Sequence, residues 1–271
     1  MSLISVADLA TRLDEPNLVV CDVRFFLADH DQGRREYHAG HVPGARFVDL
    51  HTDLGRGPGG GRHPLPNVAD FTALLGQLGI GPASFVVAYD SASGATASRL
   101  WWMLRSIGHG RVAVLDGGFP AWSAAGHPVS ADLPAISAVS YPQAPDWTGV
   151  IDADAVQQGG ALGATVIDSR SPERFRGDSE PLDAQAGHIP GAVNRFHADN
   201  VGADGLMLPI AQLAQRFAGL GSSPIVYCGS GVTACHNLLA MSLVGVFGGR
   251  LYPGSWSEWS ADPNRAVATG N

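Results

Sequence analysis

Residues 224–234 read PIVYCGSGVTA, which is an apolar run followed by a cysteine and a glycine-spaced loop. The apolar run predicts a buried strand, and the segment that starts at Ala234 is compatible with a helix. Cys228 therefore lies at the carboxyl end of a strand, just before a helix N-terminus. Backbone N–H groups in such a place favour the thiolate, which is the nucleophilic form of cysteine. Gly229 and Gly231 allow the backbone to curl around the sulfur.

The sequence contains an internal repeat with a nearly constant offset. VCDVR at 20–24 resembles VIDSR at 166–170, and GHVPGA at 40–45 resembles GHIPGA at 187–192. Two further pairs of similar blocks follow in the same order. Four matched blocks in one order indicate a duplicated domain.

We predict a first copy at 1–130, a proline-containing linker at 131–149 and a second, catalytic copy at 150–271. Both copies alternate β-branched runs with helix-like stretches. That alternation is typical of an α/β fold with a mostly parallel sheet and helices on both faces, here present twice in tandem. The expected strands are 18–23, 85–89, 112–115, 165–168, 224–227 and 250–252. The first copy has Asp90 where the second has Cys228, so the first copy is expected to be inactive.

Composition excludes several classes of function. The 271 residues carry a formal net charge of −8 and no basic run, so we expect neither nucleic-acid nor membrane binding. An N-terminal signal and a long apolar segment are both missing. Three cysteines without a Cys-x-x-Cys pair do not indicate a disulfide framework, and a cytoplasmic location fits this pattern.

Taken together, these motifs resemble the two-domain rhodanese family of sulfurtransferases, over essentially the whole chain. The CGSGVT loop looks like that of 3-mercaptopyruvate sulfurtransferases, whereas thiosulfate enzymes typically have basic residues after the cysteine. The resemblance implies that Cys228 takes sulfur from a small anionic donor as a persulfide and passes it to cyanide, a thiol or thioredoxin. Neither a cofactor nor a metal is expected. The favoured donor is 3-mercaptopyruvate. The alternatives are thiosulfate, or a sulfur carrier or redox sensor with low turnover.

The resemblance also implies roles for individual residues. Arg174 reaches the anionic group of the donor, as a guanidinium can grip a carboxylate or sulfonate. The second arginine that mercaptopyruvate enzymes usually have downstream is absent here. His63 and Ser230 form a proton relay, which helps because pyruvate leaves as an enolate. His51 occupies the usual acidic position of that relay. The loop residues expected to contact the donor are Gly229, Gly231, Val232 and Thr233.

Other interpretations of single residues stay open. Arg174 can instead pair with a surface carboxylate, and His63 can be a surface histidine on a mobile glycine-rich loop. Cys235 is either a small buried residue or a redox partner of the nucleophile. A cysteine phosphatase or arsenate reductase on the same fold needs an arginine at Cys-x₅-Arg. Ala234 occupies that position, which argues against this class.

Overall fold

The computed structural model describes residues 2–271, which form two compact units. The first unit contains the residues up to 56 together with 66–148 and 201–207. The second contains 57–65, 149–200 and 208–271. The segment 57–65 therefore belongs to the second unit, although it lies within the first copy of the sequence repeat.

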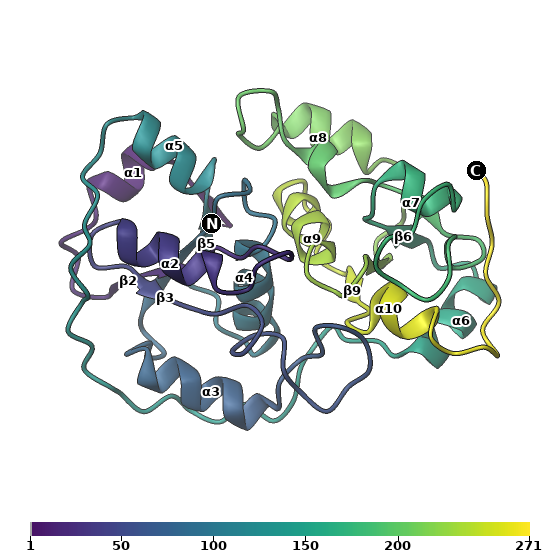
Figure 1. Cartoon of the computed structure of the whole chain (residues 1–271), viewed down its shortest axis with the longest axis horizontal. Coiled ribbons are helices and arrows are strands. Elements are labelled where there is room, and N and C mark those ends of the chain that lie inside the picture. The colour runs from purple at the N-terminus through teal and green to yellow at the C-terminus, as the bar shows by residue number, and fades with distance from the viewer. Residues whose placement is uncertain (1) are drawn as a thin grey trace. The chain divides into compact units, whose positions relative to one another are not determined.

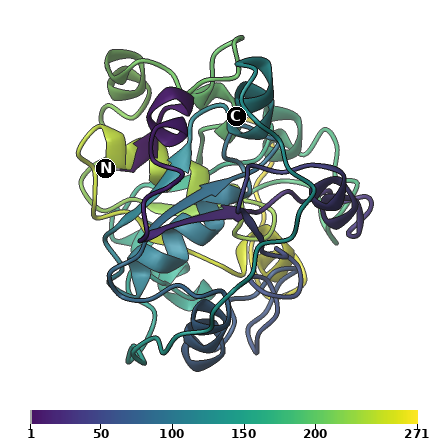
Figure 2. The same cartoon turned by 90° about the vertical axis from the view of Figure 1, so that its left-hand side faces the viewer.

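The first unit is built on a five-stranded parallel sheet in the order β1-β5-β4-β2-β3, flanked by helices (Figures 1 and 2). Its strands are β1 Leu3–Ile4, β2 Leu18–Asp22, β3 Arg46–Phe47, β4 Phe85–Tyr89 and β5 Val112–Leu115. Its helices are α1 Val6–Ala10, α2 Gln32–Ala39, α3 Val68–Gln77, α4 Ala97–Ser106 and α5 Gly118–Ala124. Residues 131–149 contain neither helix nor strand.

The second unit contains a four-stranded parallel sheet in the order β7-β6-β8-β9. Its strands are β6 Val166–Asp168, β7 Val193–Asn194, β8 Ile225–Tyr227 and β9 Arg250–Leu251. Its helices are α6 Ala153–Ala161, α7 Pro172–Arg176, the 3₁₀ helix η1 His197–Asn200, α8 Ile210–Arg216, α9 Ala234–Leu243 and α10 Ser255–Trp259. The predicted α/β class is confirmed, and the six expected strands match β2, β4, β5, β6, β8 and β9 to within one residue at either end.

The central strands are apolar because helices cover both faces of each sheet. Every residue of β4 and of β8 is buried, and both strands consist largely of valine, isoleucine and aromatic side chains. Complete burial of one such side chain stabilises the fold by about 1.5–3 kcal/mol. Within the described residues, no helix is both long and apolar enough to cross a bilayer.

Paired side chains repeat the same contacts in both units. The tyrosine that ends the central strand accepts a hydrogen bond from the turn after the Gly-His motif: Val42 N donates to Tyr89 Oη at 3.2 Å, and Ile189 N donates to Tyr227 Oη at 3.1 Å. In each Gly-His turn the histidine stacks on a ring of the preceding helix. The centroids are 4.1 Å apart for His41 and 3.8 Å apart for His188. The duplication therefore extends from the sequence to the hydrogen bonds of the core.

The loop after β4 closes around the carboxylate of Asp90. Its two oxygens accept five hydrogen bonds of 2.7–2.9 Å, from the amides of Ala92, Gly94, Thr96 and Ala97 and from the Thr96 hydroxyl. Backbone amides that converge in this way make a nest for an anion. In the first unit, the chain fills this nest with its own carboxylate.

The Asp90 nest yields a stability prediction. Asp90→Ala leaves these buried donors without an acceptor, so we expect a loss of about 3 kcal/mol or more in the free energy of unfolding. Urea unfolding of the full-length protein measures this loss. Asp14→Asn, at an exposed position of the same unit, is the control and should change the stability by less than about 0.5 kcal/mol. An Asp90→Ala protein as stable as this control would contradict the role of the nest.

Candidate active site

The cysteine loop connects the carboxyl end of β8 to α9. Cys228 directly follows β8 and is 2% exposed. Gly231 has φ +74°, and a Cβ there would lie 2.5 Å from the carbonyl oxygen of Pro253. Only glycine fits this position, because other residues rarely adopt that φ and would collide with the backbone. The glycine spacing of the sequence therefore has a steric cause.

The start of α10 holds the loop from one side. The Ser255 hydroxyl accepts a hydrogen bond from Cys228 N at 3.1 Å. Trp256 N donates to the Cys228 carbonyl at 3.0 Å, and Ser257 N donates to the Gly229 carbonyl at 2.9 Å. Ser255 adopts φ +54°, an unusual value for a residue with a side chain, which the surrounding structure must impose. The role of Ser255 was not predicted from the sequence.

Direct contacts of the loop amides with the Cys228 sulfur remain a prediction. The equivalent residue of the first unit, Asp90, supports this prediction, since the backbone amides of the loop after β4 donate hydrogen bonds to its carboxylate. Cys235 lies on the first turn of α9 and is fully buried, and its Sγ donates to the Gly231 carbonyl at 3.3 Å. This contact fits the interpretation of Cys235 as a small buried residue that braces the loop.

The second unit brings His63 and Ser230 together, although 167 positions separate them in the chain. His63 Nδ1 lies 2.9 Å from Ser230 Oγ, and both side chains are buried. The segment that carries His63 packs on α10: Arg62 N donates to Ser257 Oγ at 3.0 Å. His63 is therefore not a surface histidine. His51 belongs to the first unit, where its ring centroid lies 4.5 Å from that of His30.

Arg174 is held by two buried carboxylates. Its Nη2 donates to Glu180 Oε1 and to Asp183 Oδ2, both at 2.8 Å, while its Nε donates to Glu180 Oε2 at 3.1 Å. Its Nη1 and Nη2 also lie 3.4 and 3.6 Å from the place where a Gly229 Cβ would be. Arg174 therefore pairs with acidic residues and borders the cysteine loop at the same time. Arg176 pairs with the exposed Asp178 at 2.8 Å.

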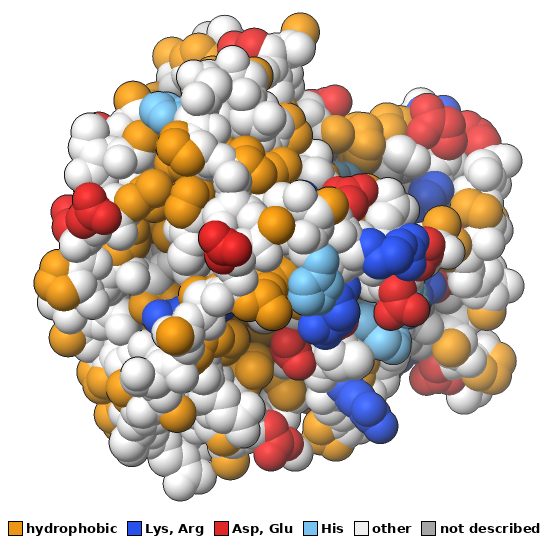
Figure 3. All heavy atoms as spheres, turned by 60° about the vertical axis from the view of Figure 1, so that its left-hand side comes forward, with side chains coloured by type: hydrophobic (Ala, Val, Ile, Leu, Met, Phe, Trp, Pro, Cys, Tyr) orange, Lys and Arg blue, Asp and Glu red, His pale blue; other side chains and the backbone are white. Residues whose placement is uncertain are grey.

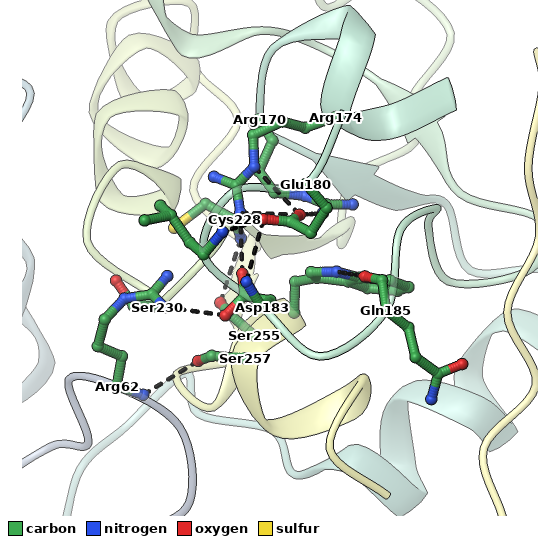
Figure 4. A network of polar contacts seen from close by, with 12 residues as sticks. Arg62, Arg170, Arg174, Glu180, Asp183, Gln185, Cys228, Ser230, Ser255 and Ser257 are labelled. Carbon is green, nitrogen blue, oxygen red and sulfur yellow. Dashed lines mark hydrogen bonds and ion pairs between the residues drawn. The ribbon is translucent and has the colours of Figure 1, made fainter. Parts of the chain in front are cut away.

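Arg62 is a second arginine at the loop, and the sequence analysis did not identify it. Its Nη1 donates to Asp183 Oδ1 at 2.8 Å, and its Nη2 lies 3.2 Å from the Gly229 Cβ position. Figure 4 shows Arg62 and Asp183 pointing toward each other beside the loop. The only sequence signal was its position next to His63.

Comparison with known proteins places this geometry in a family. The rhodanese-like domain family matches the chain twice, at residues 5–125 and 152–262. The chain belongs to the rhodanese family. The resemblance seen in the sequence, to its two-domain sulfurtransferases, is thereby confirmed.

Relatives of this rhodanese-family chain carry two donor names. A Pseudomonas aeruginosa protein named probable 3-mercaptopyruvate sulfurtransferase is 46% identical and covers 99% of this chain and 98% of its own length. A Mycobacterium tuberculosis protein with the provisional name thiosulfate sulfurtransferase is 41% identical and covers 99% and 97%. The solved 3-mercaptopyruvate sulfurtransferase from Leishmania major superposes with a TM-score of 0.83 at 30% identity, covering 96% of this chain and 74% of its own. Sequence identity alone therefore does not select the donor.

We expect the three cysteines to differ in their rates of alkylation by iodoacetamide. Burial raises the pKa of the Cys21 thiol to about 12, so this thiol stays protonated at pH 7.5 and should resist iodoacetamide. Cys228 should be labelled first, because it is the predicted nucleophile of the cysteine loop. Peptide mass spectrometry of the native protein measures the order, and urea-unfolded protein, in which all three cysteines react, is the control. Labelling of Cys21 at the rate of Cys228 would contradict the assignment.

Proposed function

We propose that this rhodanese-family sulfurtransferase uses 3-mercaptopyruvate as its donor and carries the sulfur on Cys228. The observation that carries the choice of donor is the buried contact of 2.9 Å between His63 Nδ1 and Ser230 Oγ, next to the cysteine loop. A proton relay there is useful only when the leaving group must be protonated. Pyruvate leaves as an enolate and needs a proton, whereas sulfite leaves thiosulfate without one.

The proposed first step forms a persulfide. The Cys228 thiolate attacks the sulfur of 3-mercaptopyruvate, a new S–S bond forms, and the electrons of the broken C–S bond go to the enolate of pyruvate. The Ser230–His63 pair delivers a proton to that enolate. Convergent loop amides stabilise the anionic sulfur before and after transfer.

In the proposed second step, an acceptor removes the outer sulfur. A nucleophile such as cyanide, a thiol or thioredoxin attacks this sulfur, the S–S bond breaks, and its electrons return to Cys228 as the thiolate. With cyanide, the product is thiocyanate. A physiological thiol or thioredoxin acceptor, and a cytoplasmic location, are parts of this proposal.

Thiosulfate is the second candidate donor. The observation that favours it is the pair of guanidinium groups beside Gly229, because arginine also grips a sulfonate well. A comparison of kcat/KM for the two donors, with cyanide as the acceptor, decides between them, and we expect a clear preference for 3-mercaptopyruvate. A clear preference for thiosulfate would reverse the choice of donor.

The nearly isosteric change Cys228→Ser should reduce transfer from both donors to the background rate, because a serine hydroxyl does not form the persulfide. Thiocyanate formation measures the loss, and circular dichroism checks that the fold is retained. Cys21→Ala is the matched control and should remain active, since Cys21 lies in β2 of the other sheet. Transfer above a trace level in the Cys228→Ser protein would remove Cys228 as the nucleophile.

We expect His63→Ala to lower kcat for 3-mercaptopyruvate by about 100-fold and to affect thiosulfate much less, since general acid catalysis contributes at least this factor. Ser230→Ala should give the same pattern. The double variant should lose hardly more than either single variant, because the two side chains act as one relay. His38→Ala, at an exposed position, is the control. Equal losses with both donors would argue against the relay.

A further inference from the structure

Two guanidinium groups share one buried carboxylate beside the cysteine loop. Asp183 is 3% exposed, and its two oxygens accept hydrogen bonds of 2.8 Å from different arginines: Oδ1 from Arg62 Nη1 and Oδ2 from Arg174 Nη2. These two arginines lie 112 positions apart in the chain. Asp183 therefore fixes the two positive groups next to each other.

The free edges of both guanidinium groups face the residue that follows the nucleophile. Arg62 Nη2 and Arg174 Nη1 lie 3.2 and 3.4 Å from the Cβ position of Gly229, and the hydrogen bonds to Asp183 use other nitrogens of these groups. Among the residues that the structure describes, Arg62 Nε is buried and has no hydrogen-bond partner. Several N–H groups of this pair are thus available to an anion bound beside the loop.

The charges around the pair are balanced. The network contains Arg62, Arg170 and Arg174 and the carboxylates Asp168, Glu180 and Asp183, which makes three positive and three negative groups. Figure 4 shows the three arginines with Glu180 and Asp183. A bound donor adds its own negative charge to this neutral network. The second charge of a dianion is opposed most directly by Asp183, the carboxylate that the two arginines share.

We propose that Arg62 and Arg174 together bind the anionic group of the donor, and that Asp183 positions them and selects a singly charged donor over a doubly charged one. This inference rests on the proposed function, since it concerns the donor of the Cys228 reaction. It assigns donor binding to Arg62, which lies in the same segment as His63.

Charge distinguishes the two candidate donors. Near pH 6.5, 3-mercaptopyruvate carries one negative charge on its carboxylate, because a thiol with a pKa of about 8.5 stays protonated. Thiosulfate carries two negative charges. Removal of a carboxylate close to the bound anion therefore helps thiosulfate more, and removal of a guanidinium harms thiosulfate more.

The test measures binding without turnover, in the Cys228→Ser protein at pH 6.5. Calorimetry gives Kd for 3-mercaptopyruvate and for thiosulfate, and the ratio of the two values is the readout. With Asp183→Asn added, thiosulfate should gain about three- to tenfold relative to 3-mercaptopyruvate. With Arg62→Gln added, both donors should bind more weakly, and thiosulfate should lose about threefold more than 3-mercaptopyruvate. The two variants thus shift the ratio in opposite directions.

A matched pair of controls lies just beside the site. Arg176 and Asp178 form an exposed ion pair of the same length, 2.8 Å, so Arg176→Gln and Asp178→Asn should leave the ratio unchanged. Arg62→Lys keeps the positive charge and should restore the ratio toward that of the parent protein.

The experiments distinguish failure of this donor-binding proposal from failure of the proposed function. An unchanged Kd ratio in both Asp183→Asn and Arg62→Gln would overturn the proposal that Arg62 and Arg174 bind the donor, even if Cys228 is the nucleophile. If Arg62 served only to hold the segment with His63, the otherwise wild-type Arg62→Gln enzyme would lose turnover of 3-mercaptopyruvate rather than affinity for thiosulfate, and this result would also overturn it. Transfer by the Cys228→Ser protein would instead remove the proposed function.

Discussion

The buried ion pair of Asp168 and Arg170 is the contact on which the rest of the second unit depends. Arg170 Nη2 donates to Asp168 Oδ2 and to the Gly187 carbonyl, both at 2.6 Å, and its Nη1 donates to Glu180 at 3.1 Å. Burial lowers the pKa of Arg170, but the attraction and hydrogen bonds of Asp168, together with Tyr227 and Glu180, more than offset it, so that the pKa is raised. A buried charge pair is tolerated only when its hydrogen bonds are satisfied in this way. The Arg170 guanidinium also stacks 4.5 Å over the ring of Trp256, and the backbone amide of Trp256 donates a hydrogen bond to the Cys228 carbonyl.

The first unit contains the equivalent buried ion pair, with Asp90 rather than a cysteine after its central strand. Arg24 pairs with Asp22 at 2.6 Å and stacks 4.3 Å over the ring of Phe119, whose amide donates to the Asp90 carbonyl at 2.8 Å. The ion pair therefore belongs to the architecture, since it is present whether a cysteine or an aspartate follows the central strand. Positions that differ between the copies are the candidates for the chemistry, and Cys228, which corresponds to Asp90, is the main candidate. Comparison of the two units thus separates the residues that maintain the fold from those that differ between the copies.

Features encoded by neighbouring residues could be predicted from the sequence. The strands and the start of α9 at Ala234 follow from local pattern, because they depend on side chains close in the chain. The glycine spacing of the loop was visible as well, but the collision that requires Gly231 is with the backbone of Pro253, far along the chain. The pairing of His63 with Ser230, which we propose as a proton relay, was expected only from family resemblance, since 167 positions separate these residues. Arg62 could not be found in this way, because its role depends on a contact across 121 positions. Ser255 was missed because a positive φ at a serine leaves no local sequence signal.

The charge of the whole chain explains why the arginines at the site are so tightly paired. The formal net charge is −8, and all 17 basic residues are arginines, since the sequence contains no lysine. Figure 3 shows arginine and acidic side chains interspersed on the face in view, without a broad basic surface. Long-range attraction cannot concentrate an anionic donor here, because the global field is repulsive and salt screens it within about 10 Å. Recognition must therefore act at contact distance, where planar guanidinium groups fixed by buried carboxylates lose little conformational entropy when they bind an anion. Asp183 and Glu180 reduce the net positive charge of the site, but their ion pairs fix the guanidinium groups of Arg62 and Arg174 beside Gly229.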